Sequence, residues 1–249
     1  MLTDEELLRY SRQIMLPELD IAGQEQLRKA SVLVVGLGGL GSPVAMYLAA
    51  AGVGKLVLVD HDQVDLSNLQ RQISHATDRV GVDKVASAAV MLKQLNPGCE
   101  VETVTARLTE DNADSLVSSC DVVVDCSDNF AVRFLLNRVS VACNKPLVSG
   151  AAIRMDGQVS VYDPRVPDSP CYRCLFEETG EEDLRCATNG VLAPLVGIVG
   201  SIQATEAIKV ITHVGEPLVG RLLIIDAINM NFRSVKVKPN PDCPVCSGQ

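Results

Sequence analysis

A glycine-rich turn between a short apolar strand and an Ala-rich helix constrains this chain most strongly. The run Ser31–Val35 is apolar and rich in β-branched residues, and a helical stretch extends from about Leu40 to Ala51. Between them the sequence reads Gly-Leu-Gly-Gly-Leu-Gly, with glycines at Gly36, Gly38, Gly39 and Gly41. Glycines at this place let a phosphate approach the backbone N–H groups of a helix N-terminus. The turn predicts a nucleotide site without specifying the nucleotide; a purely structural turn is the alternative.

The order of the remaining elements predicts the fold class. Apolar strands are expected at Lys55–Val59, Val101–Ala106 and Asp121–Asp125, separated by helical stretches near Lys84–Leu95 and Asp111–Ser118. Such alternation is typical of a parallel sheet covered on both faces. Beyond residue 150, Gly157–Tyr162 alternates as an antiparallel strand does, and Arg221–Asp226 gives another strand. We expect an α/β, Rossmann-like doubly wound sheet that antiparallel strands continue. Its expected parts are an N-terminal helical segment (1–30), a nucleotide-binding part (31–150) and an extension of the same sheet (151–249). Within the first part, the amphipathic stretch from Thr3 to about Leu16 predicts one helix.

Composition excludes several classes of partner. The 249 residues include 31 acidic and 22 basic side chains, a net charge of -9, which argues against nucleic acid and anionic membranes. The N-terminus lacks the basic and apolar regions of a secretory signal, so we expect a cytoplasmic protein. The longest apolar run, Val191–Ile211, reads as a buried helix rather than a membrane span, because polar residues and a proline interrupt it. These are Pro194, Gln203, Glu206 and Lys209.

Nine cysteines in a reducing compartment favour metal binding or catalysis over disulfides. Four of them form two C-x-x-C pairs, Cys171 with Cys174 and Cys243 with Cys246. Two such pairs can complete a closed, structural zinc site with four thiolate ligands, and a redox-active pair is the alternative. Because Cys243 lies 69 positions after Cys174, the metal would tie the C-terminal segment to the middle of the chain. Four other cysteines are expected to be small core residues: Cys99, Cys120, Cys126 and Cys143.

Charged residues after the second and fourth strands favour a triphosphate over a dinucleotide. Asp60, at the end of the second strand, can accept hydrogen bonds from both ribose hydroxyls. Arg71 supplies a planar cation and Lys84 a compact one. Two such cations can neutralise the charge of departing pyrophosphate, whereas an NAD site does not need them. Asp128 follows the fourth strand, at the sheet edge where ligands bind, and could hold Mg²⁺. The alternative is that Arg71 and Lys84 are ordinary surface charges and that Asp128 is a turn residue.

Taken together, these segments resemble the activating enzymes for ubiquitin-like proteins, most closely the bacterial MoeB/ThiF group. The resemblance covers nearly the whole chain, and the run Ser-Asn-Leu-Gln-Arg-Gln is its most specific part. The matching segments are Arg9–Ile14, Gly36–Gly41, Asp60, Leu66–Gln72, Lys84, Asp125–Asn129, Ser149–Ala152 and the two cysteine pairs.

The resemblance implies roles for individual residues. Asp60 would hold the ribose of ATP, Asn68, Arg71 and Lys84 would contact its phosphates, and Asp128 would serve Mg²⁺. Arg12 would reach across a homodimer interface into the partner's nucleotide site. The other candidates for contact with the nucleotide lie within the matching segments: Gln70, Gln72 and Asn129.

The implied reaction is ATP-dependent adenylylation of the C-terminal Gly-Gly carboxylate of a small ubiquitin-like sulfur-carrier protein, with release of pyrophosphate. A carboxylate is already a competent nucleophile, which agrees with three scattered histidines and no Ser-His-Asp arrangement. The molybdopterin synthase carrier is preferred because Ser149–Gln158 looks more like that branch, and the thiamine-pathway carrier is the alternative. Two alternatives of other classes are an NAD-dependent oxidoreductase, which lacks a hydride site here, and a noncatalytic zinc scaffold that binds nucleotide.

Two further expectations concern sulfur. No sulfurtransferase domain follows Gln249, so we expect a separate protein to donate sulfur. Cys186 stands beside Arg185, which favours its thiolate, and some members of the family use a cysteine in this loop for a covalent bond to the carrier. Cys186 is therefore a candidate covalent residue.

Overall fold

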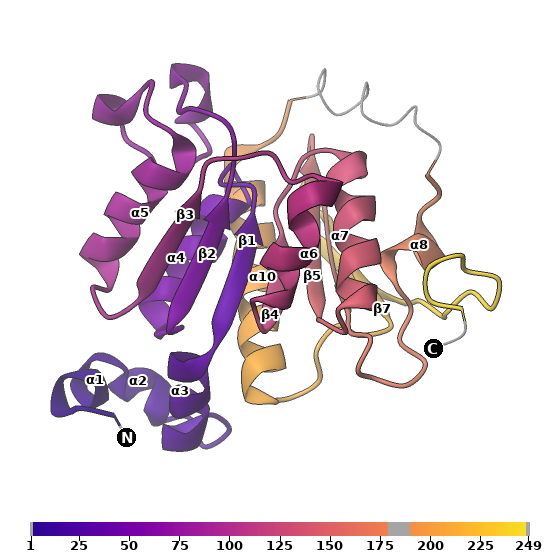
Figure 1. Ribbon diagram of the computed structural model, residues 1–249, viewed down its shortest axis with the longest axis horizontal. Helices are drawn as coiled ribbons and strands as arrows, with labels where there is room; N and C mark the ends of the chain where they lie inside the picture. The colour runs from indigo at the N-terminus through magenta and orange to yellow at the C-terminus, as the bar shows by residue number, and fades with distance from the viewer. Residues whose placement is uncertain (1, 179–189, 248–249) are drawn as a thin grey trace.

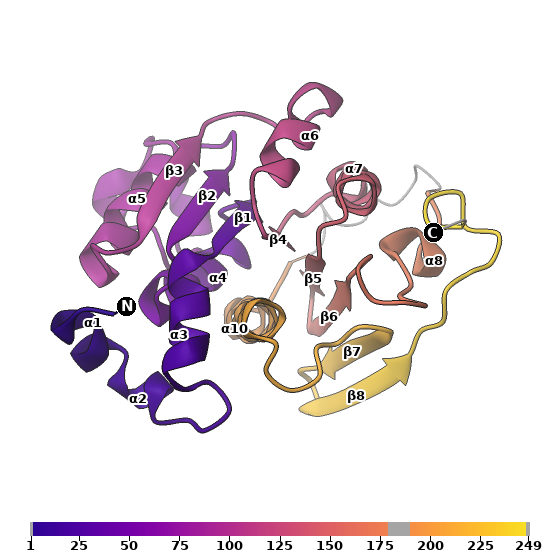
Figure 2. The same cartoon turned by 60° about the horizontal axis from the view of Figure 1, so that its bottom comes forward.

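The computed structural model describes residues 2–178 and 190–247, which contain one mixed sheet with the strand order β3-β2-β1-β4-β5-β6-β7-β8 (Figures 1 and 2). The strands are β1 (Ser31–Val35), β2 (Lys55–Val59), β3 (Glu100–Val104), β4 (Val122–Asp125), β5 (Leu147–Ile153), β6 (Asp156–Tyr162), β7 (Arg221–Asp226) and β8 (Asn231–Lys236). The first five run parallel and the last three continue the sheet antiparallel, which confirms the expected fold class.

Helices cover both faces of the sheet because successive strand residues point to opposite sides. The longer helices are α3 (Asp20–Lys29), α4 (Gly41–Ala51), α5 (Lys84–Leu95), α6 (Glu110–Ser118), α7 (Phe130–Ala142) and α10 (Ala193–Thr212). The short ones are α1 (Asp4–Arg9), α2 (Ser11–Ile14), α8 (Tyr172–Leu175), η1 (Leu66–Asn68) and η2 (Thr77–Arg79). In β1, Val32 and Val34 pack with α4, α5 and α10, whereas Leu33 and Val35 pack with α6 and α7. The two cores are largely aliphatic.

The N-terminal segment lies at the amino ends of the strands, below the sheet in Figure 1. One helix was expected from Thr3 to about Leu16, but the chain breaks at Tyr10 into α1 and α2. The side chain of Tyr10 is buried and accepts a hydrogen bond from Asn96, which fixes the break. The side chain of Gln13 donates to the carbonyl of Ala51, at the C-terminal end of α4. This segment is thus attached to the end of α4 remote from the glycine loop.

By length and composition α10 is the one helix in the described part of the chain that could cross a membrane. It lies instead against the sheet and α4, between the two halves of the molecule (Figure 2). Its buried polar side chains have internal partners. Gln203 donates to the carbonyl of Asp125 at 2.7 Å, and Glu206 accepts from the N–H of Leu218 at 2.6 Å. These bonds are those of a core helix, as the interrupted apolar run predicted.

Several elements are additional to those predicted individually from the sequence, among them α7, α3 and β8. Helix α7 begins at the N-cap Asn129, whose side chain accepts from the N–H of Val132 at 2.9 Å. Helix α3 leads directly into β1, and β8 forms the edge of the sheet with all six residues exposed. An exposed edge strand carries little of the apolar alternation that marks a strand in sequence, since neither of its faces is covered.

Candidate nucleotide and metal sites

The glycine loop joins β1 to α4 at the carboxyl edge of the parallel strands. A Cβ at Gly36 would meet the carbonyl oxygen of Cys126 at 2.8 Å, and one at Gly41 would meet the carbonyl oxygen of Gly36 at 1.9 Å. A Cβ at Gly39 would meet the side chain of Val196 at 2.9 Å. These three glycines permit close packing within the protein, and Gly36 also has a φ of 91°. The fourth, Gly38, has room.

Asp60 ends β2 and holds the glycine loop in place. Its carboxylate accepts the N–H of Leu37 at 2.7 Å through one oxygen and the N–H of Asp62 at 2.8 Å through the other. The side chain is largely buried, with 9% of its surface exposed. Each carboxylate oxygen has a second lone pair, so ribose hydroxyls can donate to Asp60 while the loop stays bound.

Residues 66–75 form the wall opposite the glycine loop. Gln72 is buried, and its amide nitrogen lies 3.5 Å from the Cβ position of Gly38. The amide oxygen of Gln72 has no hydrogen-bond partner among the described residues. The hydroxyls of Ser74 and Ser42 are 2.8 Å apart, which fastens this wall to the first turn of α4.

The other candidates in this wall differ in exposure. Arg71 is half-buried, and its guanidinium donates to the carbonyl of Ser67 at 3.1 Å. Asn68 is also half-buried, whereas Gln70 is exposed. Arg71 retains donors that can turn toward an anion, because a guanidinium has five N–H groups.

Lys84 begins α5 and is almost fully buried. Its ammonium donates to a carboxylate oxygen of Asp62 at 2.8 Å. Desolvation raises the pKa of Asp62, but the hydrogen bond and charge of Lys84 outweigh it and hold that pKa below its ordinary value. An ammonium has three hydrogens, so Lys84 can keep Asp62 and still donate to a phosphate. Sequence reasoning did not identify Asp62, whose role depends on this long-range contact.

A buried network at the end of β4 shapes the next loop. Asp125 accepts from the N–H and hydroxyl of Ser127 at 3.0 and 2.7 Å and from the hydroxyl of Ser149 at 3.1 Å. The guanidinium of Arg133 lies 3.9 Å from the same carboxylate and donates to the carbonyl of Ser127 at 2.9 Å. Burial raises the pKa of Asp125 despite Arg133 and the donors. The network holds the loop that carries Asp128.

Asp128 and Asn129 follow this network but differ in what they bind. Within residues 2–178 and 190–247 the exposed carboxylate of Asp128 makes no hydrogen bond or ion pair, so it is available to a cation. The side-chain oxygen of Asn129 is already engaged as the N-cap of α7. The Cβ position of Gly36 lies 3.3 Å from the backbone nitrogen of Ser127, so this loop and the glycine loop are neighbours.

One predicted site residue, Arg12, lies away from the nucleotide edge. Arg12 is exposed on α2, at the amino ends of the strands, whereas the glycine loop is at their carboxyl ends. Since α4 has 11 residues, its two ends are about 16 Å apart, so Arg12 does not reach the nucleotide edge of its own chain. Cys186 lies outside the described residues.

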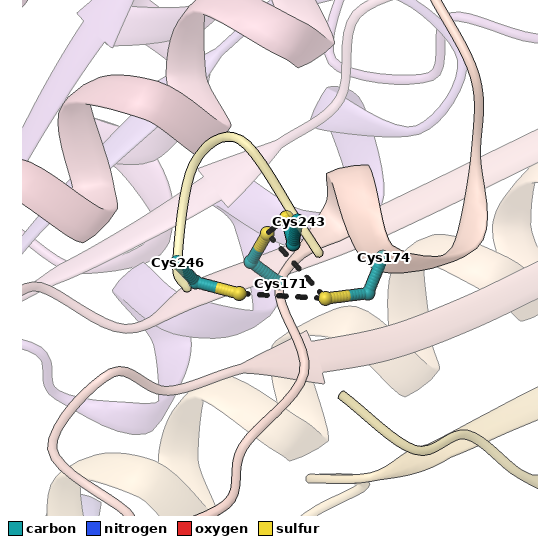
Figure 3. A group of neighbouring side chains, drawn as sticks. All are labelled: Cys171, Cys174, Cys243 and Cys246. Atoms are coloured by element: carbon teal, nitrogen blue, oxygen red, sulfur yellow. Dashed lines mark hydrogen bonds between the residues drawn. The ribbon is translucent and has the colours of Figure 1, made fainter. Parts of the chain in front are cut away.

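The four C-x-x-C thiols converge although the pairs are far apart in the sequence (Figure 3). The sulfur of Cys171 is 3.6 Å from that of Cys243 and 3.9 Å from that of Cys174, which is 3.4 Å from that of Cys246. Tetrahedral zinc with Zn–S bonds of about 2.3 Å places its sulfurs about 3.8 Å apart. The cluster therefore fits one Zn²⁺ ion.

Surrounding groups hold the thiols for a cation. Helix α8 is anchored by Tyr172, whose ring centre lies 4.5 to 5.8 Å from those of Phe134, Tyr162 and Phe176. Asn137 donates to the sulfur of Cys171, and the N–H of Asn240 donates to that of Cys174. Desolvation acts to raise the pKa of Cys243, but the N–H groups of Cys246 and Val245 outweigh it and lower that pKa to about 7. Donors of this kind stabilise metal-bound thiolates.

Three of the four remaining described cysteines are core residues, as expected. Cys99, Cys120 and Cys126 are buried, and burial raises the pKa of each thiol; Cys143 is half-buried.

The chain is similar to known proteins in both sequence and structure. The model of the ThiF family matches residues 10–245. The molybdopterin-synthase adenylyltransferase of Salmonella typhimurium is 50% identical over 98% of both chains. The adenylyltransferase and sulfurtransferase MOCS3 of Drosophila sechellia is 47% identical over 100% of this chain and 55% of its own. Among solved structures, Escherichia coli MccB with AMPCPP and MccA is 25% identical, with a TM-score of 0.85 over 99% of this chain and 75% of that one.

Proposed function

The chain belongs to the ThiF family, and we propose that it is an ATP-dependent adenylyltransferase for the C-terminal Gly-Gly carboxylate of a small ubiquitin-like sulfur carrier of the molybdopterin synthase type. The product is a carrier adenylate for molybdenum cofactor biosynthesis. One observation supports the proposal most strongly. The glycine loop, the 66–75 wall and the Asp128 loop meet at one edge of the sheet, in a chain that is similar along its length to adenylyltransferases.

The chemistry asked of the chain is electrostatic. A carboxylate oxygen of the carrier attacks the α-phosphorus, the bond to the oxygen bridging the β-phosphorus breaks, and pyrophosphate leaves with the electron pair. The attacking group is ionised at neutral pH, so no base has to remove a proton. The N-terminus of α4 and the cations Arg71 and Lys84 face the phosphates and stabilise the charge that develops on pyrophosphate. Asp60 holds the ribose, and Asn68, Gln70 and Gln72 line the phosphate wall.

The proposed enzyme uses two metal ions, Mg²⁺ at the nucleotide and Zn²⁺ at the cysteine cluster. Asp128 supplies a free carboxylate for Mg²⁺, which would neutralise phosphate charge. Asn129 fits this role less well, because its oxygen caps α7. The Cys171, Cys174, Cys243 and Cys246 cluster holds structural Zn²⁺, since four thiols leave no open position for a substrate.

The assembly is proposed as a homodimer in which Arg12 acts in the partner's nucleotide site. The distance of α2 from its own glycine loop supports action in trans. The chain divides into an arm (1–30), a nucleotide-binding part (31–150) and a carrier-binding, zinc-bearing part (151–249). We place the enzyme in the cytoplasm and assign sulfur donation to a separate protein. Cys186 is kept as a candidate covalent residue.

Carrier-dependent ATP–pyrophosphate exchange tests the proposed activity. We expect exchange with a molybdopterin-type carrier and none with the same carrier lacking its last two glycines. The thiamine-type carrier, tested in parallel, is the alternative substrate, and exchange with it alone would move the assignment to that pathway. No exchange with either intact carrier would contradict the adenylyltransferase assignment.

A further inference from the structure

The buried imidazole of His75 contacts the backbone of the glycine loop. Its Nε2 lies 3.0 Å from the carbonyl oxygen of Leu37, and its Nδ1 lies 2.9 Å from the hydroxyl of Ser87 on α5. A carbonyl oxygen only accepts, so Nε2 carries the hydrogen, and Nδ1 of the neutral ring accepts from Ser87. Only 7% of the His75 surface is exposed. Helix α5 thereby fixes both the tautomer and the direction of the ring.

This contact completes a clamp on two successive peptide groups. Asp60 accepts the N–H of Leu37 at 2.7 Å, and His75 donates to the carbonyl of the same residue. In a planar trans peptide, the carbonyl of Leu37 and the N–H of Gly38 point in opposite directions. Fixing that carbonyl therefore fixes the direction of the Gly38 N–H. Within the described chain, the Gly38 N–H has no acceptor.

The space beside Gly38 distinguishes it from the other loop glycines. A Cβ at Gly36, Gly39 or Gly41 would collide with atoms of the protein at 2.9 Å or less. A Cβ at Gly38 would meet only the amide of Gln72, at 3.5 Å. Gly38 is thus the loop glycine whose surroundings leave room for a ligand.

Resting on the proposed function, we propose that His75 is a positioning residue that aims the Gly38 N–H at a phosphate oxygen of the nucleotide. His75 acts through the Leu37–Gly38 peptide and does not touch the nucleotide. The clamp is made by Asp60 and His75, so the direction of the donor is set by the protein and not by contact with the phosphate. Lys84 and Arg71 contribute positive charge to the phosphate site, whereas His75 orients the Gly38 N–H.

Matched variants of His75 test this role by calorimetric binding of AMPCPP and of adenosine, both without carrier. His75→Gln places an amide donor where Nε2 lies, and His75→Asn places one where Nδ1 lies and leaves the Leu37 carbonyl without a donor. We expect His75→Asn to weaken AMPCPP binding about tenfold and adenosine binding less than about twofold, since adenosine has no phosphate. His75→Gln should bind AMPCPP within about threefold of the unaltered protein.

An equal loss for AMPCPP and adenosine, or no loss in His75→Asn, would overturn the inference. So would nitrogen NMR of the unaltered protein that finds the hydrogen of His75 on Nδ1, a measurement independent of whether any variant folds. Failure of the proposed function is separate: it is the absence of carrier-dependent exchange in the unaltered protein, which does not affect the binding comparison.

Discussion

The two halves of the sheet bring distant residues together by different means. From β1 to β5 the strands are parallel, so the loops after β1, β2 and β4 end at one edge and carry the nucleotide candidates there. From β6 to β8 the strands alternate in direction, so their loops do not share an edge. There, two thiols from helix α8 and its N-cap converge instead with two thiols from the segment after β8. In the parallel half, the strand order alone brings the site residues together. In the antiparallel half, a bound metal ion would link the two segments that carry the thiols.

The halves also differ in what they need from a ligand. Three buried polar side chains around the glycine loop have partners within the protein: Asp60 with Leu37, His75 with Ser87, and Lys84 with Asp62. The thiols at the other end lie 3.4 to 3.9 Å apart around a point that a cation would occupy. We therefore expect the nucleotide half to be ordered before it binds, and the cysteine half to depend on its metal for stability.

Removal of the metal should have the largest effect. In Cys243→Ser, we expect the free energy of unfolding to fall by at least about 5 kcal/mol, because a structural zinc site contributes directly to folding. AMPCPP affinity of the remaining folded protein should stay within about threefold. Zinc content, urea unfolding and calorimetry measure the three quantities.

The matched control is Cys143→Ser, which alters a half-buried cysteine outside the cluster. It should retain stoichiometric zinc and change stability by less than about 1 kcal/mol. Fresh protein without zinc, unaffected by a chelator, would refute the dependence of this half on metal.

The next largest effect is expected from Asp128→Ala. Removal of this exposed carboxylate should lower ATP–pyrophosphate exchange by about 1000-fold, because the Mg²⁺ proposed beside the phosphates would lose its protein ligand. Stability should change by less than about 0.5 kcal/mol. Asp125→Ala, three residues earlier, should instead lower stability by about 3 kcal/mol, since it leaves the buried Arg133 without that carboxylate. Thermal unfolding and exchange assays separate the two; equal exchange in Asp128→Ala and the unaltered protein would remove Asp128 from the site.

The sequence was most informative where neighbouring residues act together. The bounds of β1 and β2 were predicted as they occur, because each is a short, buried apolar run before a turn. The convergence of the four thiols followed from C-x-x-C spacing and zinc chemistry. Both signals are local and can be recognised without coordinates.

The missed contacts are long-range. Asp62 and His75 matter through Lys84 and Leu37, which lie 22 and 38 residues away. In the sequence His75 is one of three scattered histidines. The role of its buried imidazole can be recognised only when its two partners, Ser87 and Leu37, are known. The buried network of Asp125 likewise joins β4 to β5 and α7, so the residues that build the Asp128 loop could not be read from the loop itself.

Subunit mixing tests whether the nucleotide edge is complete within one chain. Arg12→Ala alone should lower exchange about 100-fold by removing a cation from the partner's site. Mixed and reassociated with Asp128→Ala, it should recover about a quarter of normal exchange: half of the dimers are mixed, and each has one intact site. Both variants retain the groups that hold α2, since Gln13 and not Arg12 bonds to α4. Mixtures no more active than the separate variants would show that Arg12 does not act in trans.

The smallest expected effect is a pH dependence of stability from His75. Desolvation lowers the pKa of this imidazole; the carbonyl of Leu37 and the charge of Asp60 oppose that effect, and Lys84 and Arg79 add to it. The unfolded chain therefore binds the proton more tightly than the folded one, with an unfolded pKa of about 6.5. The stabilising contribution is complete above that pH and is lost as pH falls toward the folded pKa. Urea unfolding of the unaltered protein and of His75→Gln at pH 7.5 and 5.5 checks this, because the other titrating groups are common to both. The unaltered protein should lose more stability on acidification than His75→Gln; an equal or smaller loss would mean that the ring is not held neutral against the glycine loop.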